Sequence, residues 1–240
     1  ASSGWSRPKR GRWRMINHTT ALLALRTQTL TLSVVTTGSA TLDATTTGYH
    51  RSSGSFLTDG LAVGMEFTPT GFAVNAAHVI TAVTATTVTT PDTIAVEAAG
   101  AGRTLAVGLP AIRAWENLTP VNGTAPISAP VAGRWYVEED YLPGPAAQVT
   151  VGPLGQIEVL PLYVLKLYGL ANTGVTALYK AADALLTLFA PRTSFTVASG
   201  DSLTVRTNPA PFRGQLMQAD PGWAVVTVTI PLRLRSPNSY

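Results

Sequence analysis

The stretch WAVVTVTIPLRLR, residues 223–235, has the clearest strand pattern in this chain of 240 residues. Apolar side chains recur at every second position from Ala224 to Leu234, whereas the positions between them include Thr227 and Arg233. Successive side chains of a strand point to opposite faces, so this alternation predicts a long strand with one buried face.

A helix is predicted upstream of that strand, over residues 174–189. Its apolar residues recur at spacings of three and four, which places them on one face: Val175, Leu178, Ala182, Leu185 and Phe189. Asn172 or Thr173 can cap its start, and Pro191 ends it. Before it, QIEVLPLYVLKLYGL (156–170) is apolar on both faces and predicts a central buried strand, with Pro161 at a bulge.

Further strands are predicted on both sides of these segments. In RWYVEEDY (134–141), alternation places Trp135, Val137 and Tyr141 on one face and Tyr136, Glu138 and Asp140 on the other. IRAWEN (112–117), SFTVASG (194–200) and SLTVRTN (202–208) are shorter candidates. Residues 109–235 therefore predict an α+β unit, interrupted by a Pro- and Gly-rich loop over 119–133.

Residues 29–108 differ in character, because short Thr-rich runs alternate with Gly, Pro, Asp and Asn. This pattern predicts a small all-β domain of five to seven strands. A short helix is expected before it, over residues 15–28, capped by Asn17 or Thr19 and with Leu22, Leu23 and Leu25 as its apolar stripe. That stripe lacks an adequate partner in the Thr-rich segment, so we expect the helix to pack on residues 109–235.

Composition excludes several classes of protein. With 45% hydrophobic and 12% charged residues the chain is not disordered as a whole, and without Cys it has no disulfide, thiol nucleophile or cysteine zinc site. Of the 17 basic residues, five lie within residues 1–14, leaving 12 against 13 acidic ones. The folded part is thus nearly neutral, which argues against a nucleic-acid-binding domain. No apolar run approaches the roughly 20 residues of a membrane span, and no signal peptide is recognised.

No constellation for catalysis, cofactor binding or metal binding is found. His18, His50 and His78 lack metal-ligand spacing, and His78 is expected to be a partly buried strand residue. There is no Ser nucleophile elbow, P-loop or dinucleotide fingerprint, and no calcium loop surrounds Glu138 to Asp140. We therefore expect a protein that is not an enzyme.

The order of these segments resembles the tail terminator (tail completion) proteins of long-tailed bacteriophages. The matching positions are Pro110, Trp115, Glu116, Asn117, Trp135, Glu138, Ala182, Asp183, Leu185, Trp223 and Ile230 to Leu232. The resemblance covers residues 109–235, with residues 15–28 as the family's N-terminal helix. Residues 29–108 then form an insertion, similar to small β modules that recur in phage structural proteins.

The resemblance implies an α+β fold, with a mixed or antiparallel sheet flanked by helices, built from residues 15–28 plus 109–240. Residues 1–14 would be a basic disordered extension and residues 29–108 an inserted all-β domain. The family forms a homo-hexameric ring that caps the tail tube and joins the tail to the head-tail connector, without catalysis or cofactors. This chain would accordingly lie in the virion at the head-proximal end of the tail, after assembly in the host cytoplasm.

The expected partners are further copies of the chain, the tail tube protein and the head-tail connector protein. No membrane and no specific nucleic acid are expected, although the genome would pass through the ring lumen. Candidate residues of the subunit interface are Trp115, Glu116, Trp135, Glu138, Asp140, Arg213, Arg233 and Arg235. An alternative is a β-rich tail-surface or adhesin-type binding protein that binds a host glycan through exposed Tyr49 and Phe56. A hydrolase with an unseen site ranks last.

Overall fold

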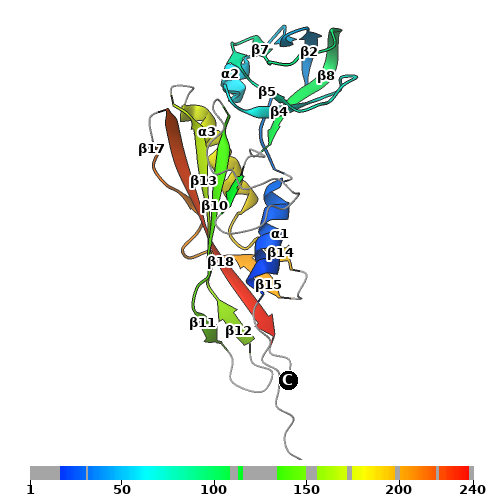
Figure 1. The fold of residues 1–240 in the computed structure, drawn as a ribbon. Helices are drawn as coiled ribbons and strands as arrows, with labels where there is room; N and C mark the ends of the chain where they lie inside the picture. The colour runs from blue at the N-terminus through cyan, green and yellow to red at the C-terminus, as the bar shows by residue number, and fades with distance from the viewer. Residues whose placement is uncertain are drawn as a thin grey trace, which may run out of the picture.

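The computed structural model describes residues 17–30, 32–108, 113–115, 134–149, 156–171, 175–197, 201–219 and 222–237. This part of the chain is β-rich, with 48% strand against 16% helix. Its strands form two sheets, one from residues 33–108 and one from residues 113–237 (Figure 1). The basic segment 1–14, the loop 119–133 and the expected caps Asn172 and Thr173 lie outside the described residues.

The long strand predicted from the alternating sequence is confirmed as β18 (Trp223–Pro237). It is the central strand of the second sheet. It pairs antiparallel with β13 (Leu162–Leu170) and then with β12 (Gln156–Val159), and on its other side with three short strands. Those three are β15 (Ser202–Val205), β16 (Phe212–Arg213) and β17 (Met217–Gln218).

Four more strands complete this sheet: β9 (Arg113–Trp115), β10 (Tyr136–Leu142), β11 (Ala146–Gln148) and β14 (Ser194–Thr196). β10 pairs antiparallel with β13 and parallel with β9, so the sheet is mixed. β11 pairs with β12, and β14 with β15.

Helix α3 (Val175–Leu188) lies on β18 and β13. Four residues of its predicted stripe are at most 2% exposed, which confirms that this face packs on a core: Leu178, Ala182, Leu185 and Phe189. Gly169 of β13 makes this close packing possible. A Cβ atom there would lie 3.0 Å from the Trp135 ring and 3.1 Å from Leu178.

Helix α1 (His18–Leu30) extends further than predicted. We expected the all-β segment to begin at residue 29, but the Thr29 hydroxyl donates to the Arg26 carbonyl and is fully buried, so the helix continues and β1 starts at Ser33. The predicted stripe was partly wrong. Leu22 and Leu25 are buried, whereas Leu23 points away from the core and is 48% exposed.

The predicted strand over residues 156–170 is two strands, separated at Leu160 and Pro161. Proline cannot donate to the ladder, although the Pro161 carbonyl accepts from the Leu232 amide. Burial alternates strictly along β13, with Tyr163, Leu165 and Leu167 enclosed. The expectation of a strand buried on both faces was therefore wrong, because one face of this sheet is only half covered.

The first sheet contains eight strands, rather than five to seven, in the order β5-β4-β8-β2-β3-β7-β6 with β1 beside β8. They are β1 (Ser33–Thr36), β2 (Ala40–Thr45), β3 (Gly48–Arg51), β4 (Glu66–Thr70), β5 (His78–Val79), β6 (Ala82–Val83), β7 (Thr87–Thr89) and β8 (Glu97–Gly108). A four-residue helix, α2 (Phe56–Asp59), was not predicted. Strand β8 is the longest of these, and its register shifts let it pair with β2 at one end and with β4 and β1 at the other.

Tyr49 and Phe56 are core residues of this first unit, which corrects the expectation that they are exposed. Tyr49 is 1% and Phe56 0% exposed. The Tyr49 ring meets Phe67 and Phe72 edge-on, with centroids 5.5 and 5.0 Å apart. Burial, assisted by the charge of Glu97, raises the pKa of Tyr49 to about 12. Neither aromatic ring is available to a glycan.

Trp135 connects the two units. Its indole Nε1 donates to the Val63 carbonyl at 3.1 Å, and its backbone amide donates to the Gly64 carbonyl at 3.0 Å. Lys180 of α3 also donates to the Thr58 carbonyl, and β1 lies against α3. Whether residues 29–108 fold as an independent domain stays a prediction.

Candidate functional site

Strand β10 has two chemically different faces. Val137 and Glu139 point toward the helices and are 0% and 4% exposed, whereas Tyr136, Glu138 and Asp140 are half-buried on the other face. The Glu139 carboxylate forms an ion pair with Arg26 of α1, whose Nε lies 3.2 Å from Oε1. The helix therefore lies on the second sheet, as predicted from its apolar stripe. The other face of β10, which carries Tyr136, Glu138 and Asp140, is only half-buried.

The register of the sheet extends this face across three strands. Tyr136 lies opposite Tyr168, and Glu138 lies opposite Lys166. On the next strand, Leu170 lies opposite Trp223. Directly opposed residues share a face, so these residues form one surface. We call the following set the open sheet face: Tyr136, Glu138, Asp140, Leu142, Lys166, Tyr168, Phe212, Met217 and Trp223.

Three aromatic rings form the centre of the open sheet face. Tyr136 and Tyr168 are stacked with centroids 4.2 Å apart and planes 7° apart, and Trp223 meets Tyr136 edge-on at 5.1 Å. The Tyr168 hydroxyl donates to Glu138 at 2.8 Å. Burial, together with this bond, raises the pKa of Tyr168, so the hydroxyl stays protonated at neutral pH. The rings are thus held in fixed positions.

Charged groups adjoin the rings. Lys166 Nζ lies 3.2 Å from Glu138 and 3.0 Å from Asp140. Partial burial would lower the pKa of Lys166, but the hydrogen bonds to Asp140 and Glu138 outweigh it, and the pKa is raised. One cation shared by two carboxylates leaves the open sheet face with one excess negative charge.

Large apolar side chains lie at the margins of the same face. Leu142 is 50%, Phe212 51% and Met217 55% exposed. Phe212 opposes Thr229, and Met217 opposes Val225, which places both on the open side of β18. Aromatic and methionine side chains are enriched at protein interfaces.

The predicted interface residues lie in several places. Glu138 and Asp140 belong to the open sheet face, whereas Trp135 is 4% exposed between the two units, which leaves it little surface for a neighbouring chain. Arg213 binds Asp183 of α3 at 2.7 Å and lies over the Tyr179 ring, on the helix side of the sheet. The side chain of Trp115, in β9, and all of Glu116 lie outside the described residues.

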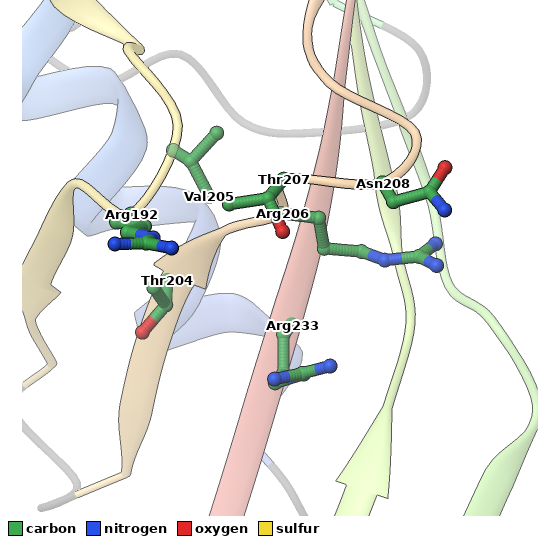
Figure 2. Close-up of a pocket in the computed structure, with 7 residues that line it drawn as sticks. All are labelled: Arg192, Thr204, Val205, Arg206, Thr207, Asn208 and Arg233. Carbon is green, nitrogen blue, oxygen red and sulfur yellow. The ribbon is translucent and has the colours of Figure 1, made fainter.

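Arg233 and Arg235 share a single carboxylate. Glu158 lies 3.2 Å from Arg233 Nε and 2.7 Å from Arg235 Nε. This group carries one excess positive charge. It also adjoins a cavity of about 180 Å³, which we call the arginine pocket, lined by Arg192, Thr204, Val205, Arg206, Thr207, Asn208 and Arg233 (Figure 2).

Neither Arg192 nor Arg206 was predicted from the sequence as a site residue. They are separated by two strands, β14 and β15, and by a segment outside the described residues, and no local motif links them to Arg233. The pairing of β15 with β18 brings Arg206 beside Arg233, and the bond from the Arg192 amide to the Val205 carbonyl adds Arg192 to the same cavity. Of the three arginines, only Arg233 lies in a segment whose alternating pattern predicted where its side chain points.

In the described part of the chain, no group of three or more His, Asp or Glu side chains is arranged to hold a metal ion. None of the helices described has the length and hydropathy needed to cross a membrane.

Comparisons with known proteins add little. No protein family and no curated protein matches the sequence. One solved structure, whose printed name states no function, is similar over 53% of this chain and 79% of its own, with 19% identity and a TM-score of 0.38. This similarity is too low to support a conclusion about function.

Proposed function

We propose that this chain is a structural virion protein of the tail terminator type, which forms a ring on the phage tail tube and joins the tail to the head-tail connector. The ordered resemblance of residues 109–235 supports this function. The mixed sheet with both helices on one side is compatible with the α+β fold expected of that family. The open sheet face is the observation that carries the proposal.

A closed ring requires two different surfaces on each chain, because each copy meets the next in a head-to-tail contact. The open sheet face, with one excess negative charge, is the first surface. The group of Arg233, Arg235 and Glu158, with one excess positive charge, is the second. Opposed charges of this kind set the register between copies and suppress wrong contacts more than they add affinity.

The aromatic and apolar residues of the open sheet face supply the affinity. Burying Leu142, Phe212 and Met217 removes apolar area from water, which stabilises the contact by about 25 cal/mol per Å² before the costs of association. A stable contact of this kind buries on the order of 1,200–2,000 Å² in total. The tail tube protein and the connector protein would then contact the two rims of the ring.

The experiment that tests this function is imaging of assembled tails, together with the native mass of the purified chain. Six chains of 25.1 kDa should give a particle of about 150 kDa. In the virion, six copies should form one ring directly on the last layer of the tail tube, at the head junction.

The position of the chain in the virion can contradict the proposal. Finding the chain at the tail tip, along the tube wall or on the capsid surface would exclude a terminator. A free monomer remains compatible with assembly on the tube alone, so the position in the virion decides, and the mass measurement distinguishes preformed from templated rings.

A further inference from the structure

The arginine pocket is built on a hydrogen-bonded backbone scaffold. The Arg192 amide donates to the Val205 carbonyl at 3.0 Å, and the Arg206 amide donates to the Pro231 carbonyl at 2.9 Å. Arg233 lies directly opposite Thr204 in the pairing of β18 with β15. The three arginines therefore come from a turn after α3, the end of β15 and the middle of β18, all of which are fixed by main-chain bonds.

Figure 2 shows how the side chains lie. Arg206 reaches from the end of β15 toward Asn208, with Arg233 below it on β18, and Arg192 lies on the other side of the pocket. Hydroxyl groups of Thr204 and Thr207 and the amide of Asn208 line the same cavity. All of these polar side chains can donate hydrogen bonds.

The positive charge of the pocket is not balanced within the described residues. Neither Arg192 nor Arg206 has a carboxylate within 4 Å there, and no acidic residue lines the cavity. The nearest acid bound to a lining residue is Glu158, which Arg233 shares with Arg235. Gathering like charges without counter-charges is unfavourable, and a bound anion would relieve it.

Arg192 also has an unfavourable backbone conformation. Its φ of 72° lies in the left-handed region, which glycine adopts freely and other residues rarely do. A side chain at this position is therefore strained, and strained residues of this kind cluster at binding sites. Replacement by glycine should relieve the strain and remove the guanidinium at once.

We propose that the arginine pocket binds a phosphate group. A phosphate monoester carries about −1.5 to −2 charges and three acceptor oxygens, which matches two uncompensated guanidinium groups better than a carboxylate with one charge and two oxygens. The pocket is open to solvent, so the phosphate can be free or can be a terminal phosphate of a larger molecule, such as the 5′ end of a nucleic-acid strand. This inference rests on Arg192 and Arg206 and is independent of the ring proposed above.

The test titrates the full chain with inorganic phosphate and pyrophosphate by calorimetry, and with a 5′-phosphorylated oligonucleotide labelled at its 3′ end by fluorescence anisotropy, at matched ionic strength. Arg192→Gly and Arg206→Gln are the pocket variants. Arg213→Gln is the matched control, because it removes one exposed arginine that lies on the helix side of the sheet. The basic segment 1–14 is present in every variant, so its contribution cancels.

We expect each pocket variant to weaken phosphate or pyrophosphate binding at least tenfold, and the control to leave it unchanged. The melting temperature of Arg192→Gly should equal or exceed that of the wild type, which excludes misfolding as the cause. Pocket-dependent binding of the oligonucleotide identifies a nucleic-acid phosphate as a source. Pocket-dependent binding of the free anions alone identifies a small phosphate ligand.

Three outcomes would overturn the inference. The wild type would bind none of the probes, or the control would weaken binding as much as the pocket variants do. In the third outcome, a poly-glutamate peptide would bind the wild type more tightly than every phosphate probe does, and both pocket variants would lose this binding. That result would assign the pocket to a carboxylate-bearing protein. None of these outcomes changes the native mass, so failure here is distinguishable from failure of the ring.

Discussion

Arg26 donates its Nε to both carboxylate oxygens of Glu139, at 3.2 Å each, and so joins α1 to β10 across 113 residues of sequence. The two side chains are 9% and 1% exposed. Burying two charges costs desolvation energy, and the pair holds only while both partners are present.

Glu139→Ala should destabilise the protein by about 3–5 kcal/mol, because it leaves the buried Arg26 guanidinium without its counter-charge. The free energy of unfolding in urea measures this. The double variant Arg26→Met with Glu139→Leu is the control, and it should recover most of the loss because an apolar pair needs no compensation. A single variant that unfolds like the wild type would show that α1 is held by Leu22 and Leu25 alone.

The docking of α1 should weaken below about pH 6.5. Burial lowers the pKa of His18 from its ordinary value of 6.5, and its Nδ1 lies 3.0 Å from the Tyr141 hydroxyl. The unfolded chain therefore binds more protons than the folded one as pH falls through 6.5. The stability from this group is complete above that pH and declines below it.

Amide hydrogen exchange of α1 between about pH 7.5 and about pH 5 checks this expectation, after correction for the intrinsic rate. His18→Gln keeps a polar side chain but removes the titration, so its α1 protection should not change with pH through this group. Equal pH profiles for the two proteins would contradict the assignment to His18.

Some of these features could be predicted from the sequence, because they follow from local periodicity. The stripe of α3 and the alternation of β18 are visible in single segments, and so is the division of β10 into the side of Glu139 and the side of Glu138. The β-rich character followed in the same way. Periodicity shows which residues share a face of a helix or strand. It is sufficient here because each of these elements buries one face.

Other features depend on what another segment supplies. Tyr49 and Phe56 could not be recognised as core residues, because the rings that enclose Tyr49 include Phe72, far along the chain. Similarly, the helix continues past Thr29 because the buried Thr29 hydroxyl finds a carbonyl acceptor in Arg26, which outweighs the strand preference of threonine. The arginine pocket likewise depends on contacts between distant segments, namely the pairing of β15 with β18 and the bond from the Arg192 amide to the Val205 carbonyl.

Trp135→Phe should loosen the contact between the two units while leaving each of them folded. The variant keeps an aromatic ring but loses the bond from Nε1 to the Val63 carbonyl, which is worth about 1 kcal/mol. Limited proteolysis near residues 58–66 should become faster. Unchanged cleavage would show that the main-chain bond from Trp135 to Gly64 is sufficient.

Deletion of residues 33–108, with a short linker in their place, should leave a soluble remainder that unfolds cooperatively. Ser33 pairs directly with Gly108, so the ends of the deleted segment lie side by side and a few residues can bridge them. The deletion removes Val63 and Gly64, which contact Trp135, so the Trp135 ring would become exposed. The deletion variant should therefore also carry Trp135→Ser. Aggregation or loss of a cooperative melting transition would contradict the two-domain interpretation.

Charge reversal tests the ring contact. Glu138→Lys with Asp140→Lys should abolish head-to-tail assembly, but it also places two new cations beside Lys166. Adding Lys166→Glu restores the pairing within the sheet and keeps the face inverted. We expect both variants to yield tails of uncontrolled length or tails that fail to join heads. Normal particles from the triple variant would mean that the contact lies elsewhere.

Removing the apolar margin offers an independent check. Phe212→Ser with Met217→Ser should change the free energy of unfolding by no more than about 1 kcal/mol, because both side chains are more than half exposed. The native mass, or incorporation into tails, should nevertheless fall sharply. Leu57→Ser, at an exposed apolar position of the first unit, is the matched control and should leave assembly unchanged.

The position of β18 along the chain has a consequence for synthesis. All five strands that pair with it precede it, so the second sheet cannot close until residue 237 has been made, whereas the first sheet needs nothing beyond residue 108. On the ribosome the first unit can thus be finished while α3 and β13 still expose their apolar faces. A nascent chain stalled before β18 should be the form that molecular chaperones retain.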